Sequence, residues 1–373
     1  MPFSSSNIDA CREQWTRTLR EIASESLDLC PDFPAVTERW EAWWRFEADR
    51  PLLCATVHGE GFPGGGKCYD LLADFDRWLA KRRSQVEHIT WYDAAIPNLR
   101  VELGPVAMAA FIGCPLHLAP EEDTTWQEPI LADWNDQTAF ELDPDNPWVR
   151  LAIDLTRVIA KDAAGRYVVT LPDLTGSIDT LANMRGPENL LLDLYDYPER
   201  VKAAVDRLVD AWETVFSSLY DTVLSAGAGT MQWLLAWSNT PYTLPTCDFS
   251  FSIGSEQFKE FCLPSLTEQA RRAGRCLFHL DGEGASKHAE ALAATPEISA
   301  VQYTPNANAP SALAKLEMFK MLQEAGKPIM VIAPLEELPA LVDELDPRGV
   351  AFYCPALHDR AAAEWAMETV GAS

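Results

Sequence analysis

Short apolar runs recur along the chain and alternate with longer amphipathic segments. Runs of this kind are typical of strands that are buried on both faces, as in a parallel sheet. Eight runs predict strands: Leu52–Val57, Ile89–Tyr92, Tyr167–Leu171, Thr230–Ala236, Arg275–Leu280, Ala300–Tyr303, Ile329–Ile332 and Val350–Cys354. Most are separated by predicted helices: Glu188–Leu224, Ser255–Ala273, Gly284–Ala294, Ser311–Ala325 and Leu335–Leu345. Eight strands alternating with helices predict a single (β/α)8 barrel, the TIM-barrel arrangement.

Two segments fall outside this alternation. Residues 1–49 are expected to form an N-terminal helical extension, in which Trp40, Trp43 and Trp44 recur at helical spacing and predict a face that packs on the rest of the fold. Residues 96–166 are expected to form an insert after the second strand that packs over the barrel. No repeat or low-complexity tract divides the chain, so we expect one domain over all 373 residues.

Composition excludes several classes of partner. The net charge of −26 argues against binding to nucleic acid or to an anionic membrane surface. No segment offers the ~18 consecutive apolar residues that a membrane-spanning helix needs. The nine cysteines include no C-x-x-C pair, and Met1–Ser6 lacks the features of a signal peptide, so we expect a reduced, cytoplasmic protein. The segment Gly61–Gly66 lacks the spacing of a nucleotide-binding loop and is expected to be a mobile loop over the barrel mouth.

Polar and aromatic residues follow several predicted strands, where barrel enzymes place their chemistry. His279 and Asp281 are two apart in an extended segment, so both face one side of the sheet and are candidate catalytic residues. Asp173 could be a general acid or base, or it could cap the next helix, and the sequence leaves both roles open. The candidates for binding a small-molecule substrate are His58, Trp91, Trp233, Asp248 and Tyr303.

The motifs around these residues have a family likeness. They include Phe278-His279-Leu280-Asp281-Gly282 and Val301-Gln302-Tyr303-Thr304-Pro305, with Pro172-Asp173-Leu174 and the run Leu191–Val201 upstream. In this order they resemble the uroporphyrinogen decarboxylase superfamily, which includes the zinc-dependent, corrinoid-linked methyltransferases. The likeness covers roughly the last two thirds of the chain, and it too implies a TIM barrel.

The resemblance implies a metal site. The methyltransferases hold zinc with a His-x-Cys pair and a distant cysteine. Here His279 occupies the histidine position, Asp281 stands where the first cysteine would be, and Cys354 stands at the distant cysteine. Three such ligands would leave an open position at which zinc could activate an acceptor. In the alternative, His279 and Asp281 bond each other or a ligand without metal, and Cys354 is a buried thiol.

The resemblance therefore implies a methyltransferase that acts on a small methylated compound or on a methyl-corrinoid partner, with zinc as the cofactor and no tightly bound organic group. No Asp-x-His-x-x-Gly motif is present, so a corrinoid would arrive on a partner protein. A homodimer is also expected. The alternatives are a cofactor-free decarboxylase of a carboxylated aromatic and a non-catalytic small-molecule or corrinoid-binding barrel. Uroporphyrinogen itself is disfavoured, because the stretch Cys54–Gly61 lacks the arginines with which the decarboxylases grip carboxylates.

Overall fold

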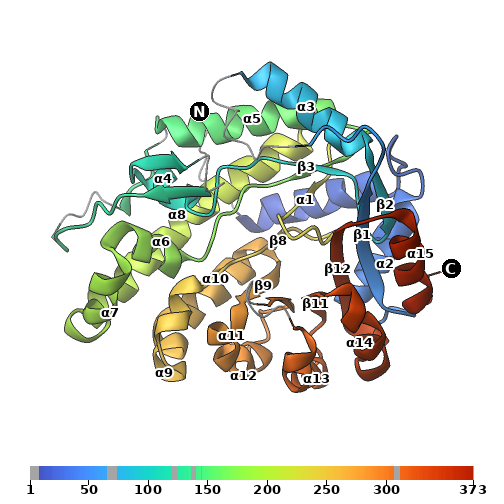
Figure 1. Ribbon diagram of the computed structural model, residues 1–373. Helices are drawn as coiled ribbons and strands as arrows, with labels where there is room; N and C mark the ends of the chain where they lie inside the picture. The colour runs from blue at the N-terminus through green and yellow to red at the C-terminus, as the bar shows by residue number, and fades with distance from the viewer. Residues whose placement is uncertain are drawn as a thin grey trace.

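Two curved sheets form the centre of the molecule, which a computed structural model describes over residues 8–64, 74–119, 124–135, 140–143, 145–305 and 311–372 (Figure 1). The last two residues of the predicted loop Gly61–Gly66 lie outside these ranges. The larger sheet has the order β2-β1-β12-β11-β10-β9-β8 and the smaller β3-β6-β7. The larger sheet comprises β1 Leu52–His58, β2 Ile89–Asp93, β8 Tyr242–Thr243, β9 Arg275–Asp281, β10 Ala300–Thr304, β11 Ile329–Ile332 and β12 Val350–Leu357. The smaller comprises β3 Asn98–Arg100, β6 Val168–Thr170 and β7 Thr230–Met231.

One predicted strand has a different role from the one expected. The run Ile89–Tyr92 is a strand, β2, but it pairs antiparallel with β1. The parallel strand at this place in the order of the fold is β3, which pairs with β6 and was not predicted. Its three residues are too few to show a periodic pattern. The ladders between described residues thus leave the two central sheets separate and do not form one continuous ring.

Helices surround the sheets (Figure 1). Their bounds are α1 Ile8–Ala23, α2 Phe33–Trp44, α3 Phe75–Glu87, α4 Ala107–Ile112, α5 Pro147–Ala163, α6 Ser177–Arg185, α7 Pro187–Asp196, α8 Pro198–Leu224, α9 Ser255–Gln257, α10 Leu263–Ala273, α11 Gly282–Ala285, α12 Ala289–Ala293, α13 Leu316–Glu324, α14 Leu338–Glu344 and α15 Arg360–Thr369. The predicted insert contains β3, α4, α5 and the hairpin of β4 (Leu116–Ala119) with β5 (Thr124–Gln127). In the described ranges, no helix combines the length and apolar character needed to cross a membrane.

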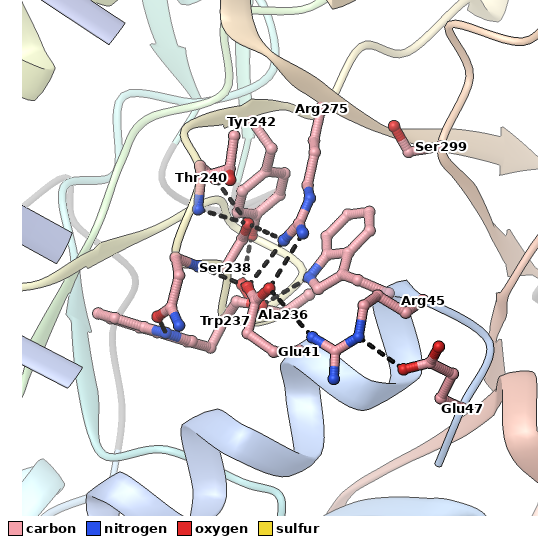
Figure 2. Close-up of polar contacts among 12 residues, drawn as sticks. Glu41, Arg45, Glu47, Ala236, Trp237, Ser238, Thr240, Tyr242, Arg275 and Ser299 are labelled. Atoms are coloured by element: carbon pink, nitrogen blue, oxygen red, sulfur yellow. Dashed lines mark hydrogen bonds and ion pairs between the residues drawn. The ribbon is translucent and has the colours of Figure 1, made fainter. Parts of the chain in front are cut away.

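An ion pair between the buried Glu41 and the half-buried Arg275 holds the N-terminal helices on the amino end of β9 (Figure 2). Glu41 of α2 accepts hydrogen bonds from Arg275 at 2.7 and 3.0 Å, and Arg275 also donates to Ser238 at 2.8 Å. The backbone N–H of Asn239 donates to Glu41 at 2.7 Å. The predicted tryptophan stripe is buried, and the indole of Trp44 donates to the backbone beside this pair. The two charges therefore stabilise each other and fix the amino-terminal end of the sheet.

Candidate active site

Strand register decides which side chains share a face of the larger sheet. His279 on β9 pairs with Gln302 on β10, which pairs with Met330 on β11, and Met330 pairs with Ala351 on β12. Because successive side chains alternate between faces, register partners in a parallel ladder point the same way. His279, Gln302, Met330 and Ala351 therefore face the interior together, and Asp281 lies on the same face at the exposed carboxyl end of β9.

His279 is held by a polar side chain of the next strand. Its Nδ1 lies 2.5 Å from Gln302 Oε1, and the Gln302 amide donates to Thr304 Oγ1 at 3.0 Å. Burial lowers the pKa of His279, against the opposing effects of Gln302 and the carboxylate of Asp281. The imidazole is thus neutral at neutral pH. Its hydrogen-bond partner is Gln302, not the Asp281 partner that one interpretation of the sequence favoured.

Trp233 and Arg100 form the next wall of the site. The indole ring of Trp233 meets His279 edge-on with ring centroids 5.0 Å apart, and the guanidinium of Arg100 lies 5.4 Å from the indole centroid. Arg100 Nε is 2.8 Å from a carboxylate oxygen of Glu102. Among the described residues, the terminal amino groups of Arg100 have no hydrogen-bond partner, so they can bind an anion.

A short buried network places Trp233. The backbone N–H of Gln232 donates to the hydroxyl of Tyr242 at 2.9 Å, and the Gln232 amide donates to the Tyr242 carbonyl at 2.8 Å. The Tyr242 hydroxyl in turn donates to Ala236 at 2.6 Å (Figure 2). Leu235 in the same turn has a left-handed φ of 61°, which costs energy for a branched side chain. Side chains thus hold Trp233 in a turn that the backbone alone disfavours.

Asp173 follows β6 and is almost completely buried, with 6% of its surface exposed. It accepts a hydrogen bond from the N–H of Thr175 at 2.9 Å, and Thr175 has a left-handed φ of 39°. Because α6 begins only at Ser177, Asp173 does not cap that helix. Burial raises the pKa of Asp173 to about 7, with further raising by Asp248, although the Thr175 N–H and Arg100 oppose the rise.

A second buried carboxyl group, Asp179 on α6, holds the loop that carries Asp248. Asp179 accepts hydrogen bonds from Thr246 Oγ1 at 2.8 Å and from the backbone N–H groups of Asp248 and Phe249 at 2.9 and 3.0 Å. Burial and the nearby Asp248 raise the pKa of Asp179 to about 7. Gly176 permits this packing, since a Cβ there would lie 2.3 Å from the Thr246 carbonyl oxygen.

These carboxyl groups line a cavity of about 320 Å³. Its wall consists of Pro105, Val106, Asp173, Thr175, Asp179, Ala182, Asn183, Pro187, Thr246, Asp248, Phe249 and Ser252. Burial and the charge of Asp281 raise the pKa of Asp248. Asp248 thus lies in the cavity wall, and its role in binding a substrate stays a prediction. The cavity offers carboxyl groups that can keep protons near neutral pH.

The predicted metal ligands are not brought together. On β11, Ile332 follows Val331 and lies on the same face as His279, so its register partner Tyr353 lies on that face too. Cys354 follows Tyr353 and therefore lies on the face opposite to His279. Its thiol donates to the Ala333 carbonyl at 3.6 Å, and burial raises its pKa to about 12. Within the described ranges, no group of three or more His, Cys, Asp or Glu side chains is arranged to hold a metal ion. The set His279, Asp281 and Cys354 therefore does not fit a zinc ion.

Three predicted substrate contacts also lie apart from the His279 group. Tyr303 is on the opposite face of β10 from Gln302, and its ring packs edge-on against Phe319 of α13 at 5.4 Å. His58 is exposed at the end of β1 and stacks on Phe62. The Trp91 indole donates to the Val86 carbonyl at 3.4 Å. Neither His58 nor Trp91 has a hydrogen bond or ring contact with the His279 group in the part of the chain that the structure describes. Since β2 runs antiparallel to β1, its carboxyl end points away from the carboxyl ends of the parallel strands.

Sequence reasoning missed Arg100, Asp179, Gln302 and Tyr353. Tyr353 faces the same side as His279, because it is two residues beyond Ala351. Burial raises its pKa to about 12, and Arg100 opposes that rise. Alternation along the predicted strand Val350–Cys354 could have identified Tyr353 as a residue of the interior face. Gln302 lies next to Tyr303 in the predicted strand Ala300–Tyr303, where the same alternation applies. Arg100 had no such signal, because β3 was not predicted.

Known proteins resemble this chain in sequence and in fold. The family described as Uroporphyrinogen decarboxylase (URO-D) matches residues 84–345. Among solved structures, a methyltransferase from Methanosarcina mazei has a TM-score of 0.59 and 11% sequence identity, over 90% of this chain and 98% of that chain. At this identity the likeness shows the fold alone. No curated protein matches the chain. Because the family match spans more than half of the sequence, the predicted resemblance is confirmed, and the chain belongs to the uroporphyrinogen decarboxylase family.

Proposed function

We propose that the protein is a cofactor-free decarboxylase of a small aromatic carboxylic acid. The observation that carries this proposal is the buried Asp173 carboxyl group, which lines the cavity and whose pKa is raised to about 7. A carboxylic acid that keeps its proton near neutral pH is suited to donate it to carbon. The residues that would hold zinc for methyl transfer do not converge, so the proposed reaction uses no metal.

Asp173 would act as the general acid. Its proton is added to the ring carbon that bears the carboxylate, and the bond between that carbon and the carboxylate then breaks. The electron pair of the broken bond returns to the ring, carbon dioxide leaves, and Asp173 regains a proton from solvent. The net reaction converts an aromatic carboxylate and one proton into the arene and carbon dioxide.

Arg100 and Trp233 would bind the substrate. The unpaired terminal amino groups of Arg100 suit a carboxylate, and the Trp233 ring offers an aromatic surface beside them. One arginine beside several carboxyl groups suits a substrate with a single carboxylate. A tetrapyrrole with many carboxylates would need more cationic partners than the single Arg100.

Methyl transfer is the second candidate. It is favoured by the carboxyl groups of the cavity wall, which in their ionised form would attract a cationic methylated amine. In this case a corrinoid protein would be the partner that carries the methyl group.

A product assay separates the two candidates. The purified protein would be incubated with ¹³C-carboxyl-labelled benzoates and hydroxybenzoates, and separately with methylated amines and a methyl-corrinoid protein. We expect labelled carbon dioxide, and we expect its release to persist after dialysis against a chelator. In Arg100→Met the KM should rise at least about 10-fold, because a charged hydrogen bond to the substrate is lost. Arg157→Met, on the exposed face of α5, is the matched control. Corrinoid demethylation without carbon dioxide would overturn the proposal in favour of methyl transfer.

A further inference from the structure

The tautomer of His279 follows from its contact with Gln302. The atom that faces His279 Nδ1 is the amide oxygen Oε1, and a carbonyl oxygen can only accept a hydrogen bond. Nδ1 therefore carries the hydrogen, and Nε2 of the neutral ring has a lone pair. The amide nitrogen of Gln302 donates to Thr304 Oγ1 at 3.0 Å, which is consistent with this orientation of the amide.

The lone pair on Nε2 is available to a ligand. Among the described residues Nε2 has no hydrogen-bond partner, and it is not one of the fully buried atoms that lack one. His279 is 8% exposed and faces the interior, beside Trp233. Burial lowers the pKa of the ring, so the lone pair is present at neutral pH. The site thus presents a fixed acceptor next to the aromatic wall that Trp233 forms.

We infer that His279 Nε2 recognises a hydroxyl group on the substrate ring, so that the substrate class is a phenolic carboxylic acid. This inference rests on the proposed function. A hydroxyl donates to Nε2, whereas a methoxy or a second carboxylate group cannot and would leave the acceptor unsatisfied. Gln302 would be the positioning residue that keeps Nε2 in the accepting state.

The same contact would assist the chemistry. As Asp173 protonates the ring carbon, the phenolic proton moves to Nε2, and the oxygen supplies the electrons that form a neutral ring ketone. When the bond to the carboxylate breaks and carbon dioxide leaves, its electron pair restores the aromatic ring, and the imidazolium returns the proton to the oxygen. His279 is unchanged at the end, and the net reaction remains that of the decarboxylation.

Binding measurements test the inference without turnover. We would titrate 4-hydroxybenzoate, 2-hydroxybenzoate, 4-methoxybenzoate and benzoate into the Asp173→Asn protein by calorimetry. We expect at least one hydroxybenzoate to bind at least about 10-fold more tightly than the methoxy compound, since an unpaired buried acceptor is costly. In His279→Phe this preference should vanish while benzoate binding persists. Equal affinity of the hydroxy and methoxy compounds would overturn the inference.

Nitrogen NMR of the histidine ring gives a second readout. In the unliganded protein, the Nδ1 signal of His279, assigned with His279→Phe, should be that of a protonated nitrogen and the Nε2 signal that of an unprotonated one. Gln302→Leu should mix the tautomers and lower the hydroxyl preference, and Gln302→Glu, which restores an acceptor at Nδ1, should recover the Nδ1–H form. A wild-type signal showing protonated Nε2 would overturn the tautomer assignment.

The outcomes separate this inference from the proposed function. A hydroxyl preference without carbon dioxide from the wild-type protein counts against decarboxylation alone. Carbon dioxide release with no hydroxyl preference counts against the role of His279 alone.

Discussion

The two ends of strand β9 lie in opposite electrostatic environments. At the amino end, Arg275 donates two hydrogen bonds to Glu41 and a third to Ser238, so a positive charge meets a negative one (Figure 2). At the carboxyl end, Asp281 lies among other carboxyl groups, and its charge raises the pKa of Asp248. The same strand therefore contributes to a compensated ion pair at one end and to a group of like charges at the other.

This difference separates scaffold from site. Opposite charges joined by several hydrogen bonds fix geometry, and they hold α2 on the sheet. Burial, and to a smaller degree the neighbouring like charges, oppose ionisation, so that carboxyl groups such as Asp173 and Asp179 retain protons up to about pH 7. Retained protons make stability depend on pH, and they are what proton transfer to a substrate requires.

Removing the acid at the carboxyl end should have the largest effect. Asp173→Asn keeps an acceptor for the Thr175 N–H but cannot donate a proton as a carboxyl group does. We expect carbon dioxide release to fall about 10²–10⁴-fold, typical of a lost general acid, with an unchanged circular dichroism spectrum. Asp154→Asn on the exposed face of α5 is the control. An Asp173→Asn protein with wild-type turnover would show that the raised pKa has no catalytic role.

The same substitution should change how stability depends on pH. The carboxyl group of Asp173 has a pKa of about 7 in the folded protein and an ordinary value of 3.8 in the unfolded chain, so between these values the folded state binds one more proton. The wild-type free energy of unfolding should therefore fall, relative to Asp173→Asn, as pH rises from about 4 to 7, by up to roughly 4 kcal/mol. Urea titrations at several pH values measure this difference. A difference that does not vary with pH would contradict the raised pKa.

Breaking the ion pair at the amino end should affect stability and spare chemistry. Arg275→Met leaves the Glu41 carboxylate with only the exposed Arg45, 4.0 Å away, as a counter-charge, and we expect the free energy of unfolding to drop by about 3 kcal/mol. Adding Glu41→Gln should restore most of the loss, because no buried charge then remains. Carbon dioxide release per folded molecule should be unchanged in both. Loss of turnover in a folded Arg275→Met protein would mean that the two ends are not independent.

The smallest effect is expected at Cys354. Because its thiol lies on the face opposite to His279, Cys354→Ala should cost about 1 kcal/mol of stability and leave turnover and metal content unchanged. Elemental analysis and the carbon dioxide assay check both. Metal lost together with activity in this variant would restore the predicted zinc site.

Most of the strand and helix pattern could be predicted from the sequence. Buried strands such as Arg275–Asp281 are apolar runs between breaks, and the tryptophan stripe of α2 has helical spacing. β3 could not be found, because its pairing with β6 depends on tertiary contacts and not on its own three residues. The direction in which β2 pairs with β1 could not be predicted either, because the local sequence pattern of a strand does not distinguish parallel from antiparallel pairing.

The site was predicted in part, for a related reason. His279, Asp173, Trp233 and Asp248 follow strands or lie in a nearby loop, and the structure connects them through short contacts and mutual pKa effects. The assignment of Cys354 instead depended on register. A shift of one residue along β12 exchanges Cys354 for Tyr353 on the interior face, and family position alone does not fix that shift.

Because β1 and β12 are neighbours in the larger sheet, that sheet can be completed only after both strands have been synthesised. Leu52 pairs with Ala351, so the first strand leaves the ribosome long before its parallel partner has been made. During synthesis β1 has only the antiparallel β2 beside it, and its other edge stays open to unwanted pairing. Closing the ladder is thus a late event that must wait until β12 has been synthesised. A chaperone that shields this edge would raise the yield of folded protein more than it would raise its stability.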